Sequence, residues 1–166
     1  MVLDYALHYP AGLSGVIAAA APLGEVGVPP FLMALGRIMS RICPRFSLEV
    51  GMYLSGLARD PAVVETILAD PLFHRRGTAR LSTEVTAAIQ RVQARAETLS
   101  VPLLILHGSA DRMVPPEGSR RFFSRVHHTD RELRMYPGAY HGIFADVGYE
   151  EVLKDVDRWL EGHIQA

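Results

Sequence analysis

The sequence predicts an α/β fold with parallel strands, flanking helices and a helical insertion. Two apolar runs, at residues 16–21 and 103–106, show no polar alternation, which is typical of strands covered on both faces. The segments between and after them carry apolar residues at helical spacing. This order of elements favours right-handed crossovers between parallel strands. The 166 residues suffice for one domain with a real core.

Residues 1–24 are expected to form a helix and a strand of the core. The segment before Pro10 has apolar residues at helical spacing, namely Val2, Leu3, Ala6 and Leu7. It has neither an N-cap residue nor a capping box, so we expect polypeptide to precede it. The apolar run that begins at Val16 and ends at Ala21 follows as a strand, although its four alanines also suit a helix.

Residues 25–98 are expected to form a helical cap insertion that contains no strand. Asp60 is placed to cap a helix with Pro61 at its first position, and Asp70 with Pro71 ends that helix. A second helix is expected from Ser82 onward, because apolar residues then recur every three or four positions. These residues are Val85, Ile89, Val92, Ala96 and Leu99.

Residues 99–166 are expected to complete the core, with residues 103–106 as the second buried strand. A helix that opens at Pro116 should turn three side chains inward, namely Phe122, Phe123 and Val126. The alternation of apolar and polar residues around Leu133 and Met135 predicts an edge strand with one face exposed to solvent. A closing helix should bury one apolar stripe, formed by Tyr149, Val152, Leu153, Val156, Trp159, Leu160 and Ile164.

Two candidate residues for acid–base chemistry, Asp111 and His141, each follow a predicted strand. Loops at the carboxyl ends of parallel strands share one edge of the sheet, and neighbouring strands lie ~5 Å apart. We therefore expect the carboxylate to bond the imidazole, which would fix its tautomer and stabilise its protonated form. Alone, Asp111 could simply close a turn, and His141 could simply bond the backbone.

Four stretches then point to a family. "LLILHGSADRMVPPEGS", "RMYPGAYHGIFAD" and the helix with Trp159 resemble the end of an α/β-hydrolase, and "LARDPAVVETILADPLFHRRGTAR" resembles the cap of one group. That group is the monoacylglycerol lipases and lysophospholipases, the serine aminopeptidase-like (S33) hydrolases. The resemblance implies that Asp111 is the triad acid, that His141 is the triad base, and that the substrate is a small lipid or ester.

The nucleophile that this resemblance implies is absent from the sequence. Ser14, Ser55 and Ser109 do not lie in the pattern G-x-S-x-G that carries the serine in this superfamily. We expect the serine and the oxyanion hole to precede the first residue, so that the chain is the C-terminal portion of a serine hydrolase cleaving carboxylic esters. We expect it to be inactive alone, and its apolar strand at residues 16–21 to act as an edge that favours self-association.

Two other interpretations remain open at this stage. An aspartate nucleophile at the elbow would give dehalogenase or epoxide hydrolase chemistry, while a scaffold without turnover would be a non-catalytic interaction module. The genomic sequence upstream would discriminate among them.

The cap suggests a place for the substrate. An apolar segment with Phe31, Leu32, Met33 and Leu35 could admit an acyl chain, or could simply pack the cap helix.

Composition argues against other classes of partner and cofactor. A net charge of −1 gives no reason to expect nucleic acid, and no apolar stretch reaches the ~20 residues that span a bilayer. We expect no metal and no nucleotide cofactor, because adjacent His127 and His128 would not converge on one ion and no phosphate-binding glycine motif occurs. Cys43 is expected to be buried and inert. A cytoplasmic protein is the default interpretation.

Overall fold

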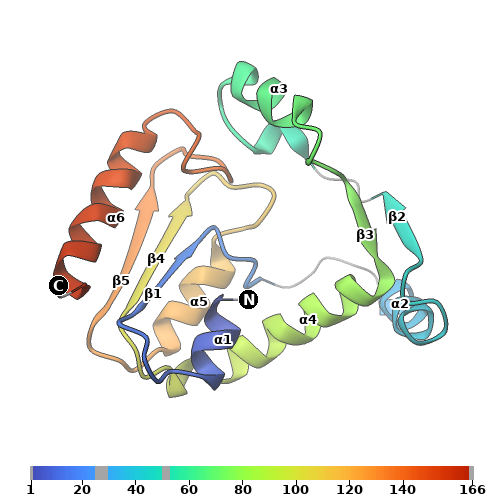
Figure 1. Cartoon of the computed structure of the whole chain (residues 1–166), viewed down its shortest axis with the longest axis horizontal. Helices are drawn as coiled ribbons and strands as arrows, with labels where there is room; N and C mark the ends of the chain where they lie inside the picture. Colours follow the sequence, from blue (N-terminus) through green and yellow to red (C-terminus); the bar gives the residue numbers. More distant parts are fainter. Residues whose placement is uncertain (1, 25–29, 50–52, 165–166) are drawn as a thin grey trace.

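Three parallel strands form the central sheet of the protein. The computed structural model describes residues 2–24, 30–49 and 53–164. The strands β1 (Val16–Ala19), β4 (Leu103–Gly108) and β5 (Arg131–Tyr136) lie in the order β1-β4-β5, with Val16 opposite Leu103 and Leu103 opposite Arg131 (Figure 1). The parallel sheet predicted from the sequence is thus confirmed, with β5 at one edge and β1 at the other.

Helices cover both faces of this sheet. The helices α1 (Val2–His8), α4 (Ala79–Ala94) and α5 (Glu117–Arg125) contribute buried side chains to one face, and α6 (Tyr149–His163) covers the other (Figure 1). Alternate residues of β4 enter the two cores, since Leu103 and Ile105 point to one side and Leu104 and Leu106 to the other. The unbroken apolar run of β4 is therefore buried on both faces, as expected for a central parallel strand.

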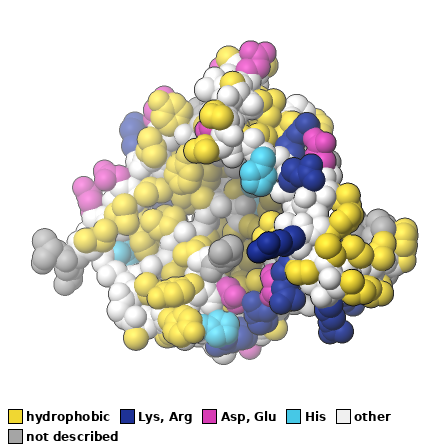
Figure 2. Space-filling view, turned by 45° about the vertical axis from the view of Figure 1, so that its right-hand side comes forward, with side chains coloured by type: hydrophobic (Ala, Val, Ile, Leu, Met, Phe, Trp, Pro, Cys, Tyr) yellow, Lys and Arg dark blue, Asp and Glu magenta, His cyan; other side chains and the backbone are white. Residues whose placement is uncertain are grey.

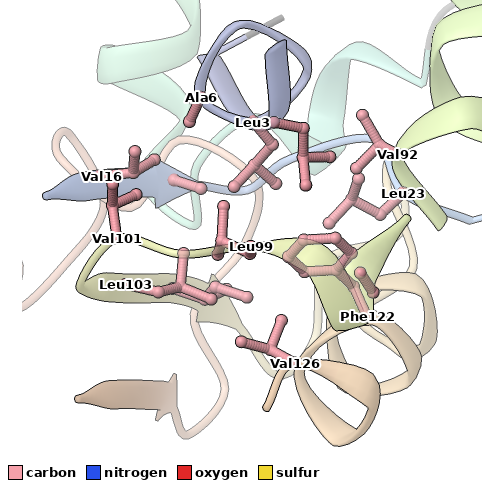
Figure 3. Packing of buried hydrophobic residues seen from close by; sticks show 14 residues of the cluster. Leu3, Ala6, Val16, Leu23, Val92, Leu99, Val101, Leu103, Phe122 and Val126 are labelled. Atoms are coloured by element: carbon pink, nitrogen blue, oxygen red, sulfur yellow. The ribbon is translucent and has the colours of Figure 1, made fainter. Parts of the chain in front are cut away.

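The larger core draws side chains from widely separated parts of the chain. Figure 3 shows Leu3 of α1, Val92 of α4, Phe122 of α5 and Leu103 of β4 within one cluster of buried side chains. Phe122 and Leu103 are completely buried, and burying a side chain of this size stabilises the fold by about 1.5–3 kcal/mol. This core fixes β4 rigidly beneath the loop that follows it.

The closing helix α6 buries less of its predicted stripe than expected. Val152 and Trp159 are buried, and Val156 and Leu160 pack against them. The other three members of the stripe are exposed, namely Tyr149, Leu153 and Ile164. Leu153 lies on the side of the helix. Tyr149 and Ile164 lie at its two ends, beyond the surface of the narrow sheet.

The insertion contains a small sheet, so the prediction of no strand in this region was wrong. It comprises α2 (Pro30–Ile42), β2 (Ser47–Glu49), the 3₁₀ turn η1 (Leu54–Gly56), α3 (Pro61–Ala69) and β3 (Arg76–Thr78). β2 and β3 pair antiparallel, and Arg76 bonds the hydroxyl of Ser47 across them. Three-residue strands are too short to show a periodic pattern, which is why the sequence did not reveal them.

The capping signals of the insertion are largely as predicted. Asp60 accepts a hydrogen bond from the backbone N–H of Ala62 at the start of α3, and α3 ends at Ala69. α4 begins at Ala79, earlier than the expected Ser82, because Thr78 caps it. Its far end, with the 3₁₀ turn η2 (Ala96–Thr98), enters the large core, so α4 joins the segment that carries β2 and β3 to the central sheet (Figure 1). No helix in the described ranges is long and apolar enough to cross a membrane.

Candidate active site

The loops that follow β4 and β5 meet at the carboxyl edge of the sheet. Asp111 lies just after β4, and His141 lies just after β5. Oδ2 of Asp111 accepts a hydrogen bond from Nδ1 of His141 at 2.8 Å. The structure thus brings together the two residues whose contact the sequence predicts.

The carboxylate of Asp111 is completely buried and held from several sides. Its Oδ1 accepts hydrogen bonds from the backbone N–H groups of Met113, at 2.9 Å, and Val114, at 2.8 Å. Burial alone would raise the pKa of Asp111, but hydrogen bonds from His107, His141 and the Val114 backbone outweigh it and hold the pKa well below its usual range. Asp111 is therefore an anion at neutral pH, with its geometry fixed by the loop.

A second histidine, His107, also contacts this carboxylate. Its Nε2 lies 3.3 Å from Oδ2 of Asp111 and 2.9 Å from the carbonyl oxygen of Val114, and its Nδ1 lies 2.9 Å from the hydroxyl of Ser119. This contact was not predicted from the sequence. The available signal was the "HGSAD" stretch, in which an imidazole at the end of a buried strand precedes the acid by four residues.

His141 has one ring nitrogen engaged and the other available. Its side chain is 28% exposed, and no hydrogen bond to Nε2 is found within the ranges that the structure describes. Because Nδ1 donates its hydrogen to Asp111, Nε2 of the neutral ring carries a lone pair. The ring is therefore arranged to accept a proton from a group placed next to Nε2.

The loop that carries His141 is held both by the core beneath α6 and by the segment that leads to α3. Ala139 and Ile143, on either side of His141, are buried in the core beneath α6. The backbone N–H groups of His141 and Gly142 donate to the carbonyl oxygens of Gly56 and Leu57, at 3.1 and 2.7 Å. The histidine loop is thus docked on the cap segment that leads to α3.

The buried carboxylate of Asp146 also holds the histidine loop against the segment that leads to α3. It accepts hydrogen bonds from the backbone N–H groups of Arg59, Tyr140 and Val147 and from Nε of Arg59. Burial would raise the pKa of Asp146, but these donors lower it below the usual value. Sequence reasoning missed this residue, because its partner Arg59 lies 87 positions away.

Glycine permits the close approach of the two active-site loops. A Cβ at Gly108, the last residue of β4, would lie 2.3 Å from the carbonyl oxygen of Tyr140 and 2.4 Å from that of Ala139. The N–H of Ala110 donates to the same Ala139 oxygen at 3.0 Å. A larger residue at position 108 would push the histidine loop away from the acid.

The proposed acyl-chain residues do not gather at this pair. Phe31 and Leu35 of α2 are 70% and 52% exposed, Met33 is half-buried, and the side chain of Leu32 lies outside the described residues. α2 packs on α4, far from the two loops in Figure 1. Figure 2 shows hydrophobic side chains gathered over this end of the molecule, beside Lys and Arg side chains.

Among residues 2–24, 30–49 and 53–164, no group of His, Cys, Asp or Glu side chains is arranged to hold a metal ion. Cys43 is exposed, contrary to the expectation that it is buried, because it follows the last turn of α2 at the surface of the cap.

Comparison with known proteins identifies relatives over nearly the whole chain. The family model "Serine aminopeptidase, S33" matches residues 1–148. A monoacylglycerol lipase of Mycolicibacterium smegmatis is 33% identical over 166 residues, which cover 99% of this chain and 59% of that protein. A monoglyceride lipase of Mus musculus is 30% identical, with coverage of 100% and 50%.

A solved structure shows the same arrangement of elements. The crystal structure of Paleococcus ferrophilus monoacylglycerol lipase superimposes with a TM-score of 0.93 at 36% identity, covering 98% of this chain and 64% of that one. The chain therefore spans about three fifths of the length of the first of these relatives.

Proposed function

The chain belongs to the serine aminopeptidase S33 family, and on this basis we propose that it forms the acid- and histidine-bearing part of a serine hydrolase that cleaves carboxylic esters. The hydrogen bond between Asp111 and His141, at the shared edge of parallel strands, carries this proposal. The names of the relatives, monoacylglycerol lipase and monoglyceride lipase, favour a monoacylglycerol as the class of substrate.

In the proposed reaction, His141 acts as the general base. Its Nε2 takes the proton of a serine hydroxyl as that oxygen attacks the ester carbonyl, and returns the proton to the departing alcohol. Water, activated by the same nitrogen, then hydrolyses the acyl-enzyme. Asp111 keeps the hydrogen of His141 on Nδ1 and stabilises the imidazolium while it exists.

We propose that the serine and the oxyanion hole come from polypeptide outside these 166 residues. None of the serines in the sequence lies in the pattern G-x-S-x-G. Loss of a single oxyanion donor already costs about 10²–10³ in rate, so the isolated chain should show no ester turnover above background.

We also propose that the chain divides into a core and a cap. In this proposal residues 1–24 and 99–166 belong to the core, and residues 25–98 form the cap, with the end of α4 packed into the core. Phe31 and Leu35 are offered as acyl-chain contacts, supported by their exposure on an apolar helix face.

Complementation tests the proposed function. The 166-residue chain would be co-expressed with a matching N-terminal segment that carries a serine in the pattern G-x-S-x-G, and hydrolysis of a monoacylglycerol and a p-nitrophenyl ester would be measured. We expect turnover from the pair, none from either part, and a loss of about 10⁴-fold in kcat for Asp111→Asn.

The controls separate the chemistry from the folding. His141→Ala should abolish turnover of the pair, whereas His128→Ala, a change outside the site, should leave it intact. Ester hydrolysis by the chain alone, or turnover that survives His141→Ala, would reject the proposed function.

A further inference from the structure

His107 is a polar side chain in the most apolar part of the fold. It occupies β4 directly after Leu106, in a strand whose residues are all buried, and its own side chain has no exposed surface. Burying a polar ring costs free energy unless each polar atom is bonded. Both of its nitrogens are within hydrogen-bond distance of partners, so the ring is held by a specific network.

The partners of His107 decide where its hydrogen lies. Nε2 faces only acceptors, the carbonyl oxygen of Val114 and the carboxylate oxygen Oδ2 of Asp111, so this nitrogen must carry a hydrogen. In the neutral ring, Nδ1 then accepts the hydroxyl hydrogen of Ser119, which is also fully buried. Ser119 thus helps to set the ring orientation from the opposite side.

The contact with His107 completes the restraint on Asp111. Backbone N–H groups hold Oδ1, and because the carboxylate is planar both of its oxygens turn together about the Cβ–Cγ bond, so a contact at the second oxygen further restrains this rotation. Oδ2 lies between two imidazoles, with His107 at 3.3 Å and His141 at 2.8 Å. The carboxylate plane is therefore defined before His141 bonds to it. Val114 strengthens the arrangement, since it donates to Asp111 through its N–H and accepts from His107 through its carbonyl oxygen.

We propose that His107, braced by Ser119, is a positioning residue whose Nε2 hydrogen, shared between the Val114 carbonyl oxygen and Oδ2 of Asp111, holds the carboxylate in the orientation that receives the Nδ1 hydrogen of His141. The catalytic meaning of this role rests on the proposed function, but the orientation itself is a property of the chain as it stands. His107 does not contact the substrate in this scheme and acts only through Asp111.

Nuclear magnetic resonance on the ¹⁵N-labelled 166-residue chain tests this role directly. The Nδ1 hydrogen of His141, bonded to a carboxylate, reports the contact through its exchange rate with water. His107→Met keeps an apolar body but removes the donor, and we expect exchange to rise by about tenfold or more. His107→Gln can place an amide N–H near the position of Nε2 and should restore slow exchange.

Matched variants guard against a merely structural effect. Ser119→Ala removes the brace of His107 and should speed exchange, whereas Ser124→Ala, an exposed serine of the same helix, should not. His163→Gln alters a separate histidine–aspartate pair, with Asp130, and should also leave the His141 signal unchanged.

The outcomes are decisive in either direction. Unchanged exchange in folded His107→Met would overturn the proposal. If that variant does not fold, equal exchange in Ser119→Ala and Ser124→Ala would overturn it instead, and faster exchange in Ser119→Ala alone would support it. Since this measurement needs no ester turnover, a complemented enzyme without activity would reject the proposed function and leave the positioning role standing.

Discussion

Asp111, the proposed triad acid, also contributes to the stability of the fold. Its buried carboxylate is stabilised as an anion by backbone N–H groups and by imidazoles. Removing the charge therefore affects the fold as well as the chemistry, and stability measurements can detect it in the isolated chain.

Acid should destabilise the protein through Asp111. Its folded-state pKa is lowered, while in the unfolded chain an aspartate titrates near its ordinary value of about 3.9. The stabilisation is fully present above about pH 5 and is lost as pH falls through the unfolded pKa toward the folded one. We expect the free energy of unfolding, from urea titrations, to fall between about pH 5 and pH 2.

The variant Asp111→Asn tests whether Asp111 causes this dependence of the free energy of unfolding on pH. The variant should be less stable at pH 7 by about 1–3 kcal/mol and should show a shallower pH dependence. Asp157→Asn, which changes an exposed aspartate of α6, serves as the control and should keep the wild-type slope. A full slope in Asp111→Asn would assign the acid sensitivity to other carboxyl groups, Asp146 among them.

At the scale of elements, the contact between the loops after β4 and β5 depends on their backbones. Gly108→Ala would place a methyl group 2.3 Å from the Tyr140 carbonyl oxygen, and neither backbone can yield easily. We expect a loss of about 1–3 kcal/mol in the free energy of unfolding. Gly162→Ala near the end of α6, where a Cβ meets nothing within 4 Å, should be neutral or stabilising.

The junction between the histidine loop and the cap depends on Asp146. Asp146→Asn leaves one acceptor oxygen and turns an NH₂ group toward N–H donors, so we expect a loss of about 2–4 kcal/mol. Hydrogen exchange at the Gly142 amide, which bonds the Leu57 carbonyl oxygen, should accelerate beyond the global change. Asp60→Asn is the matched control, because asparagine caps a helix as well as aspartate does.

The elements that the sequence predicted share a physical basis. β4 and α4 have long apolar patterns that only one kind of packing satisfies, so local sequence was sufficient. β2 and β3 were missed because each has only three residues and their pairing depends on the chain between them folding back. The exposed flank of α6 was missed because periodicity does not show where a sheet ends.

At the scale of the whole molecule, both edges of the central sheet are unpaired among the described residues. β1 is an edge strand among the described residues, and an apolar edge presents N–H and carbonyl groups to other chains. Val2, Tyr5 and Tyr9 of the neighbouring α1 segment are also exposed. These features support the hypothesis that the isolated chain associates through this edge.

A positive charge introduced on the edge strand β1 tests whether the chain associates through that edge. Ala19 is the exposed last residue of β1, so Ala19→Lys should oppose strand pairing without entering the core. We expect sedimentation velocity to shift from associated species toward the monomer. Ala69→Lys, at the exposed end of α3, adds the same charge elsewhere and should leave the distribution unchanged. A wild-type chain that is monomeric throughout would contradict the hypothesis.

The sequence by itself determined the α/β class, the parallel order of the strands and the meeting of Asp111 with His141. All of these follow from local apolar runs and from the rule that parallel strands end at one edge. Only the tertiary structure decided that His107 and Ser119 brace the acid and that Asp146 ties the histidine loop to Arg59. Such hydrogen bonds depend on the direction of side chains from separate elements, and direction is fixed only when the elements pack together.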